Sequence, residues 1–341
     1  MPRLSTRSSL WILLSVVITA SVILSLPTLL AISIQSEQKR ALSAMSEQFP
    51  VTVNPREKTI VENMQVNTFL ESPGSPLQAA VGNVGGVFGD LFAWAAVAVS
   101  NAPWYQSLAA ATMGGDRFVT VMPGMRKEQV AKVFAEALAW NAKQKKEFLA
   151  DSSATLSLLP EGSFSPGIYS LAMGTTPSTA RALVNDRFTE EVLSHYGTTT
   201  AQMVPLGQAL TIASLIEREA GGTDDMRLIS GVIWNRLFIN MRLQIDATLQ
   251  YAKANTAAAQ SWWPKATPAD MSRSSPYNTY LHSGLPPAPI ANPSVASILA
   301  ALNPRNTSCL FYFHDANGQF HCTDTYAEHV ALLKKYYGRG K

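Results

Sequence analysis

The chain has 341 residues, a length typical of about two domains. Only 15% of the residues are charged, the net charge is +3, and the mean hydropathy is slightly positive at +0.05. Disorder requires low hydrophobicity and high net charge, so this composition excludes it over most of the chain, and the small charge argues against a nucleic-acid partner. Two cysteines are too few for a disulfide scaffold or a four-cysteine zinc site.

The first predicted element is a membrane anchor at residues 10–34. This stretch has no charged side chain and is long enough to cross a hydrocarbon core of about 30 Å. The alternative is a cleaved signal peptide, but its apolar core usually has only about 7–15 residues. Residues 1–9 are too few to hold a domain, so we expect them to form a short cytoplasmic tail. The folded part is then expected to be exported to the other side of the membrane.

The next segment, residues 35–115, is predicted to be a stalk and an irregular membrane-proximal region. Its apolar stretch at 79–102 could be taken for a second membrane span. It contains an aspartate and several glycines, and each glycine weakens a helix by about 1 kcal/mol, so we expect it to pack against the folded domain instead. At 116–150 an alternating strand, a Pro-Gly turn and a helical pattern predict a small module. Strands and helices alternate irregularly through 151–341, which predicts an α+β fold.

A predicted helix at 206–220 carries a glutamate on its apolar face. Glu217 follows Ala213 by four residues and Leu210 by seven, so the three share one side of the helix. A carboxylic acid in apolar surroundings resists ionisation and can donate a proton to a leaving oxygen. Glu219 lies on a different face and does not pair with it. The alternative is that both are ordinary helix-end residues, with Glu217 bridged to an arginine.

Several motifs accompany this helix. A second helix is predicted to begin at Thr223 and to end near Asn240. In chain order, the motifs are LTIASLIERE, VIWNRL, MRLQIDATLQY, SPYNTY and SGLPPAPIANPS. Together they resemble the endolytic murein transglycosylase family, the YceG-like (MltG) proteins. The resemblance extends from about residue 115 to the C-terminus and is strongest over 208–294.

The resemblance implies an enzyme anchored in the bacterial plasma membrane by a single span, with its catalytic domain on the extracytoplasmic side. Such an enzyme cuts nascent peptidoglycan strands between N-acetylmuramic acid and N-acetylglucosamine. The resemblance also implies a 1,6-anhydro end, termination of glycan elongation, no cofactor, and a peptidoglycan synthase as candidate partner. The catalytic glutamate of the family corresponds to Glu217, which would protonate the glycosidic oxygen and then accept the C6 hydroxyl proton. Since the sugar's own hydroxyl is the nucleophile, the two carboxylates of most glycosidases are not required.

Nine residues match motif positions of the family and are candidates to line a glycan groove. Their amides and hydroxyls would bind sugar substituents, and their tyrosine rings would stack on sugar rings. They are Asn235, Arg236, Gln244, Asp246, Thr248, Tyr277, Asn278, Thr279 and Tyr280. The alternative is structural, with Asn235 and Arg236 connecting a helix to a loop and SGLPPAPI forming a rigid scaffold loop.

Two parts of the chain depart from the family pattern. Segment 161–169 resembles one that usually has Asp-Thr after its proline, but Gly167 and Ile168 stand there. The family's membrane-proximal module resembles a LysM fold, and here only residues 117–149 fit it. Because residues 50–115 depart from that pattern, glycan binding by the module is not expected.

The C-terminal residues predict a helix from Asn292 to about Leu302, then a hairpin and a last helix with a capping box of Thr325 and Glu328. Three histidines in this region lack the close spacing of metal ligands, so we expect no metal.

The two cysteines lie at the far end of this predicted hairpin. With the loop tip at 316–317, Cys322 would face Phe311 and Cys309 would face Asp324. The two cysteines are then diagonal neighbours, about 7–8 Å apart at Cα, at or beyond the disulfide limit of about 7 Å. We therefore expect two free, buried thiols.

Two other functions are compatible with the motifs. One is a membrane-anchored peptidoglycan-binding scaffold without turnover, although an intact Glu217 favours an enzyme. The other is a muramidase-type hydrolase, which needs a second carboxylate to activate water; Asp246 is the candidate in these motifs.

Overall fold

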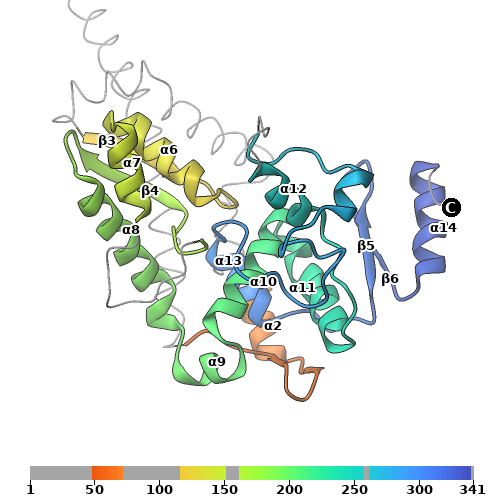
Figure 1. Cartoon of the computed structure of the whole chain (residues 1–341). Helices are drawn as coiled ribbons and strands as arrows, with labels where there is room; N and C mark the ends of the chain where they lie inside the picture. The colour runs from red at the N-terminus through yellow and green to blue at the C-terminus, as the bar shows by residue number, and fades with distance from the viewer. Residues whose placement is uncertain (1–47, 72–115, 151–160, 256–260, 339–341) are drawn as a thin grey trace, which may run out of the picture.

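The computed structural model describes residues 48–71, 116–150, 161–255 and 261–338. The anchor predicted at 10–34 and the apolar stretch at 79–102 lie outside these ranges. Within the described ranges, no helix combines the length and the apolar character needed to cross a membrane. These ranges contain helices and three two-stranded antiparallel sheets, which agrees with the α+β prediction (Figure 1).

The first described segment packs against the larger hydrophobic core. Its elements are β1 (Val53–Asn54), β2 (Thr59–Ile60) and α2 (Met64–Glu71). Phe49, Val53 and Leu70 are buried in that core. The prediction of a stalk and an irregular membrane-proximal region at 35–115 is therefore wrong over 48–71, because apolar side chains distributed along this segment complete the core.

A smaller lobe has a hydrophobic core of its own and lies to one side of the central helices (Figure 1). Its elements are β3 (Asp116–Val121), α6 (Lys127–Leu138), α7 (Ala142–Leu149), β4 (Gly167–Ala172) and α8 (Pro177–Glu191). β3 pairs antiparallel with β4, and Val119 lies opposite Tyr169. The strand and helical pattern predicted at 116–150 are present. The boundary predicted after residue 150 is wrong, because it separates two paired strands.

Gly167, where the sequence departs from the family pattern, leaves space for an arginine. Its φ is +147°, and a Cβ built there would lie 2.2 Å from Nη1 of Arg187. Arg187 donates to the Ile168 carbonyl at 3.1 Å and forms an ion pair with Glu191 at 3.2 Å. A side chain at position 167 would have to displace this guanidinium.

The larger core is built around α10. After η1 (Leu193–His195) and α9 (Thr198–Met203), its elements are α10 (Leu206–Glu219), α11 (Thr223–Phe238), α12 (Asp246–Ala254), η2 (Pro268–Ser272) and α13 (Val295–Leu302). α10 packs against α11, α12 and α13, and every residue from Ala209 to Ile216 is buried. Ser214 accepts a hydrogen bond from the Ile290 N–H at 3.0 Å. This bond attaches the proline-rich loop to the central helix.

A hairpin and a helix complete the chain on the other side of the central helices (Figure 1). They are β5 (Phe311–His314), β6 (Phe320–Thr323) and α14 (Tyr326–Tyr337). The predicted hairpin is confirmed, and so is the capping box of Thr325 and Glu328. Two of the histidines here bind carboxylates: His314 contacts Asp225, and His321 contacts Asp315.

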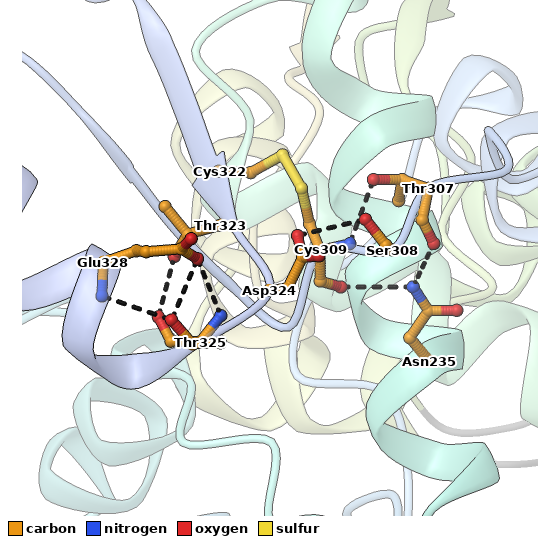
Figure 2. Close-up of a disulfide and its surroundings, with 9 residues drawn as sticks. All are labelled: Asn235, Thr307, Ser308, Cys309, Cys322, Thr323, Asp324, Thr325 and Glu328. Carbon is orange, nitrogen blue, oxygen red and sulfur yellow. Dashed lines mark hydrogen bonds between the residues drawn. A yellow bond between two sulfur atoms is a disulfide. The ribbon is translucent and has the colours of Figure 1, made fainter.

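A disulfide joins Cys322 of β6 to Cys309, which lies just before β5 (Figure 2). Cys309 and Cys322 have their Cα atoms 5.7 Å apart. The prediction of free thiols is wrong because the ladder starts only at Phe311, so Cys309 lies outside it and is free to approach Cys322. The predicted register is also wrong by one residue, since Cys322 lies opposite Tyr312 rather than Phe311, but this shift by itself would not bring the two cysteines together.

Removal of the disulfide should lower the stability of the protein. The bond joins positions 13 residues apart, and closing a loop of about this length is worth about 3 kcal/mol in the chain-entropy model. We expect the Cys309→Ser, Cys322→Ser double variant to melt about 6–12 °C below wild type in circular dichroism. Intact mass checks the bond itself, since reduction should add about 2 Da to wild type; an unchanged mass would contradict it.

Candidate active site

Glu217 lies in the last turn of α10, opposite the N-terminus of α13. Its Oε2 accepts three hydrogen bonds, from the Ser294 N–H at 2.9 Å, the Ser294 Oγ at 2.7 Å and the Ser297 Oγ at 2.7 Å. Within the part of the chain that the structure describes, no donor is bonded to its Oε1. One carboxylate oxygen is thus anchored, and the other remains available for proton exchange.

The surroundings of this carboxyl group are polar. Ser294 is the N-cap of α13, and a helix N-terminus carries a partial positive charge that favours an anion. Leu210 and Ala213, on the same face of α10, are buried as expected, whereas Glu217 is half-buried. The apolar setting predicted for the carboxyl group is therefore wrong. The pattern of α10 shows which face points inward, but α13 places hydroxyls at the end of that face.

Glu219 has a different environment. Its Oε2 accepts a hydrogen bond from the Tyr312 hydroxyl at 2.9 Å. Burial raises the pKa of Glu219 to about 7, although the Tyr312 hydrogen bond acts in the opposite direction. As predicted, the two glutamates do not pair, because Glu217 is bonded to α13 and Glu219 to β5.

Two of the groove candidates connect α11 to other segments. The Asn235 side-chain amide donates to the carbonyls of Thr307 and Cys309 (Figure 2). Arg236 donates to the Leu310 carbonyl before β5 and to carbonyls before α12. These bonds favour the structural alternative for both residues.

Thr248, Asn278 and Thr279 are also buried and bonded inside the protein. The hydroxyls of Thr248 and Thr279 are 2.9 Å apart, and the Asn278 amide donates to carbonyls of the loop before it. Their polar side-chain atoms hold the segments around α12 together.

Four candidates keep accessible side chains. Gln244 and Asp246 are exposed, and Tyr277 and Tyr280 are half-buried. The Tyr280 hydroxyl donates to Asp246 at 2.7 Å. These four remain predictions for direct contact with a glycan.

Asn292, which the sequence indicated only as the start of a helix, joins three segments. Its buried side chain accepts two N–H groups of loop 161–164 and donates to the Met125 carbonyl and the Glu161 carboxyl group. It therefore holds that loop and the turn after β3 against the entrance of α13, two residues before Ser294. Local periodicity carries no signal for this role, because the three segments are distant in the chain.

Glu161 is buried beneath this junction and is only 3% exposed. Its Oε1 accepts hydrogen bonds from the Lys127 N–H and the Asn292 amide. Burial, and then the neighbouring Glu128 charge, raise the pKa of Glu161 to about 8. Glu161 is therefore protonated in the folded protein at neutral pH.

Glu161→Gln should make stability less dependent on pH. Because the folded-state pKa of Glu161 exceeds its unfolded value, its contribution to stability is fully present below pH 4.5 and is lost as pH rises through about 8. Glutamine mimics the protonated acid, so the variant should lose less stability than wild type between about pH 5 and 8.5. Urea unfolding at both pH values measures this loss. The matched control is Glu136→Gln at an exposed position, and equal losses in wild type and Glu161→Gln would contradict the prediction.

No group of three or more histidine, cysteine, aspartate or glutamate side chains among the described residues is arranged to hold a metal ion.

Comparison with known proteins places the chain in a family. The model of the YceG-like family matches residues 98–335. An endolytic murein transglycosylase from Bacillus subtilis (strain 168) is 30% identical over 256 residues, which cover 68% of this chain and 68% of that protein. One from Streptococcus pneumoniae serotype 2 (strain D39 / NCTC 7466) is 31% identical over 188 residues, which cover 53% of this chain and 34% of that protein.

A solved structure has a similar fold. It is the crystal structure of a yceG-like protein from Listeria monocytogenes, with a TM-score of 0.55 and 22% sequence identity. The match covers 84% of this chain and 97% of the Listeria chain. The motifs, the family match over most of the chain and the Bacillus relative agree. This chain belongs to the YceG-like family.

Proposed function

We propose that this chain is an endolytic lytic transglycosylase, which cleaves peptidoglycan between N-acetylmuramic acid and N-acetylglucosamine and leaves a 1,6-anhydro end. Its family and the names of its relatives support this activity. The observation that carries the proposal is the geometry of Glu217, with one carboxylate oxygen held by three donors and the other open. A single acid held in this way can transfer one proton in both directions.

In this proposal Glu217 is both the general acid and the general base. Protonated Oε1 gives its proton to the glycosidic oxygen while the bond from that oxygen to C1 breaks. The C6 oxygen of the same sugar then bonds to C1, and its proton passes to Oε1. One bond is broken, one is formed, no water is consumed, and the acid is regenerated.

The three donors stabilise the charge that this cycle creates. When Oε1 has given up its proton, the carboxylate is negative, and Ser294 and Ser297 already point hydrogens at its Oε2. Donors that are in place before the charge develops need no reorganisation during the reaction. The N-terminus of α13 acts in the same direction.

A hydrolase on the same site would need a second carboxylate near the sugar to activate water. Asp246, the candidate for that role, is bonded to Tyr280 and acts electrostatically on Glu219. Asp246 is therefore associated with Glu219, the glutamate that is bonded to β5, rather than with Glu217. This arrangement favours the transglycosylase over the hydrolase.

The masses of the products test the proposal. The full chain in detergent would be incubated with uncrosslinked glycan strands, and the fragments would be measured by mass spectrometry. Fragments lighter by one water than ordinary reducing ends are expected. Fragments with added water would indicate a hydrolase, and binding without any fragments would indicate the scaffold function.

We further propose that residues 10–34 anchor the chain in the plasma membrane, with the folded part on the extracytoplasmic side. Nascent glycan strands are then the substrate, and a peptidoglycan synthase is the candidate protein partner. The disulfide between Cys309 and Cys322 supports export, because disulfides persist mainly in oxidising compartments.

A further inference from the structure

Arg218 follows Glu217 on α10, and its guanidinium donates no hydrogen bond to a protein acceptor in the described ranges. Its side chain is half-buried, and its Nε is buried without a hydrogen-bond partner. No carboxylate of these ranges lies within salt-bridge distance of its guanidinium. Removing a charge from water is costly unless the charge is paired, so this arrangement suggests that a ligand completes it.

Comparison with the other stacked arginines shows that a guanidinium without a protein acceptor is unusual here. In the described part of the chain, five arginines stack on aromatic rings. Four of them also donate to a protein acceptor, and these are Arg126, Arg181, Arg187 and Arg236. Arg218 stacks in the same way, with its Cζ 4.0 Å from the centre of the Trp263 ring. Stacking occupies the face of the guanidinium and leaves the N–H groups at its edge free to donate.

The backbone of Gly124 brings the Arg218 and Glu217 side chains to one place. A Cβ built on Gly124 would lie 3.1 Å from Nη1 of Arg218 and 3.7 Å from Cγ of Glu217. Both side chains therefore lie against the same turn, which is held at the entrance of α13 by the hydrogen bond from the Gly124 N–H to the Asn292 carbonyl. A group bound by Arg218 would be close to the proposed acid.

A guanidinium at this place fits an oxygen acceptor on the sugar that reacts. Arginine binds carboxylates through two parallel hydrogen bonds and also donates to single carbonyl oxygens. N-acetylmuramic acid offers both, the carbonyl of its N-acetyl group and the carboxylates of the peptide on its lactyl group. We propose that Arg218 is a substrate-binding residue that holds such an oxygen acceptor and so positions this sugar at Glu217. This inference rests on the proposed function.

The test uses the full chain with two substrates, glycan strands that carry their peptides and the same strands after an amidase has removed them. Arg218→Gln should raise KM about tenfold or more with a much smaller change in kcat, because lost charge-assisted hydrogen bonds weaken binding. Arg218→Lys keeps the charge but loses the two-pronged geometry, so its KM should lie between that of wild type and that of Arg218→Gln. The matched control is Arg56→Gln in the exposed turn between β1 and β2, which should leave both constants unchanged.

The two substrates distinguish the sources of the acceptor. A similar rise in KM on both assigns it to the sugar itself, either its N-acetyl carbonyl or its lactyl group, whose carboxylate the amidase leaves behind. A rise only on strands with peptides assigns it to a peptide carboxylate; both results support the proposal. A KM within about twofold of wild type on both substrates would overturn it. A fall in kcat alone would do so as well, since Arg218 would then act on Glu217 rather than on the substrate.

Three further measurements keep this test independent of folding and of the proposed function. Thermal unfolding shows whether Arg218→Gln is folded, and if it is not, the KM of Arg218→Lys decides by the same criteria. Wild-type turnover tests the proposed function separately, because it must produce anhydro ends whatever Arg218 binds. Glycan affinity compared between Glu217→Gln and the Glu217→Gln, Arg218→Gln double variant tests Arg218 without turnover, and equal affinities would overturn its role.

Discussion

Replacement of Glu217 by glutamine should slow glycan cleavage by about 10²–10⁴-fold and leave the melting temperature nearly unchanged. The amide has the same shape, and its oxygen can still accept the hydrogen bonds of Ser294 and Ser297. It cannot give a proton to the glycosidic oxygen and then take one from the C6 hydroxyl. Cleavage rates on glycan strands and circular dichroism melts measure the two effects.

Glu219→Gln is the matched control, with the same change two residues further along α10. Glu219 is bonded to Tyr312 rather than to α13, so its loss should reduce activity by less than about tenfold. Equal losses at the two positions would make the assignment unsafe. Glu217→Gln with more than about a tenth of wild-type activity would remove Glu217 from the catalytic role.

Asn292→Ala should destabilise the protein by about 3–5 kcal/mol, as expected when a buried hydrogen-bond network is broken. The change leaves two N–H groups of loop 161–164, the Met125 carbonyl and the Glu161 carboxyl group without this partner. These groups come from two segments that Asn292 connects to the entrance of α13. Urea unfolding measures the change in free energy.

Asn303→Ala provides the comparison. Asn303 is equally buried, but its amide donates only to the carbonyls of Pro50 and Leu299. We expect a smaller loss of stability than for Asn292→Ala, because fewer buried groups lose their partner. If Asn303→Ala were as damaging, the junction at Asn292 would not have the importance that its contacts indicate.

Much of the larger core could be predicted from local patterns. The helix expected at 206–220 is α10 (Leu206–Glu219), and the helix expected from Thr223 is α11 (Thr223–Phe238). The hairpin and the capping box of the last helix are also present. Periodicity, capping residues and turns act over a few neighbouring positions, so the sequence contains them directly. The order of the motifs likewise identified the family before any contact was known.

The setting of the candidate site required the tertiary structure. Ser294 is 77 residues from Glu217, and Asn292 is 131 residues from Glu161. The pairing of β3 with β4, the burial of Phe49 and the approach of Cys309 to Cys322 also join separate segments. The period of α10 indicates that Glu217 points inward, but it contains no information about what another segment places there. A carboxyl group predicted among apolar side chains therefore lies among hydroxyls, because packing of α13 against α10 determines its surroundings.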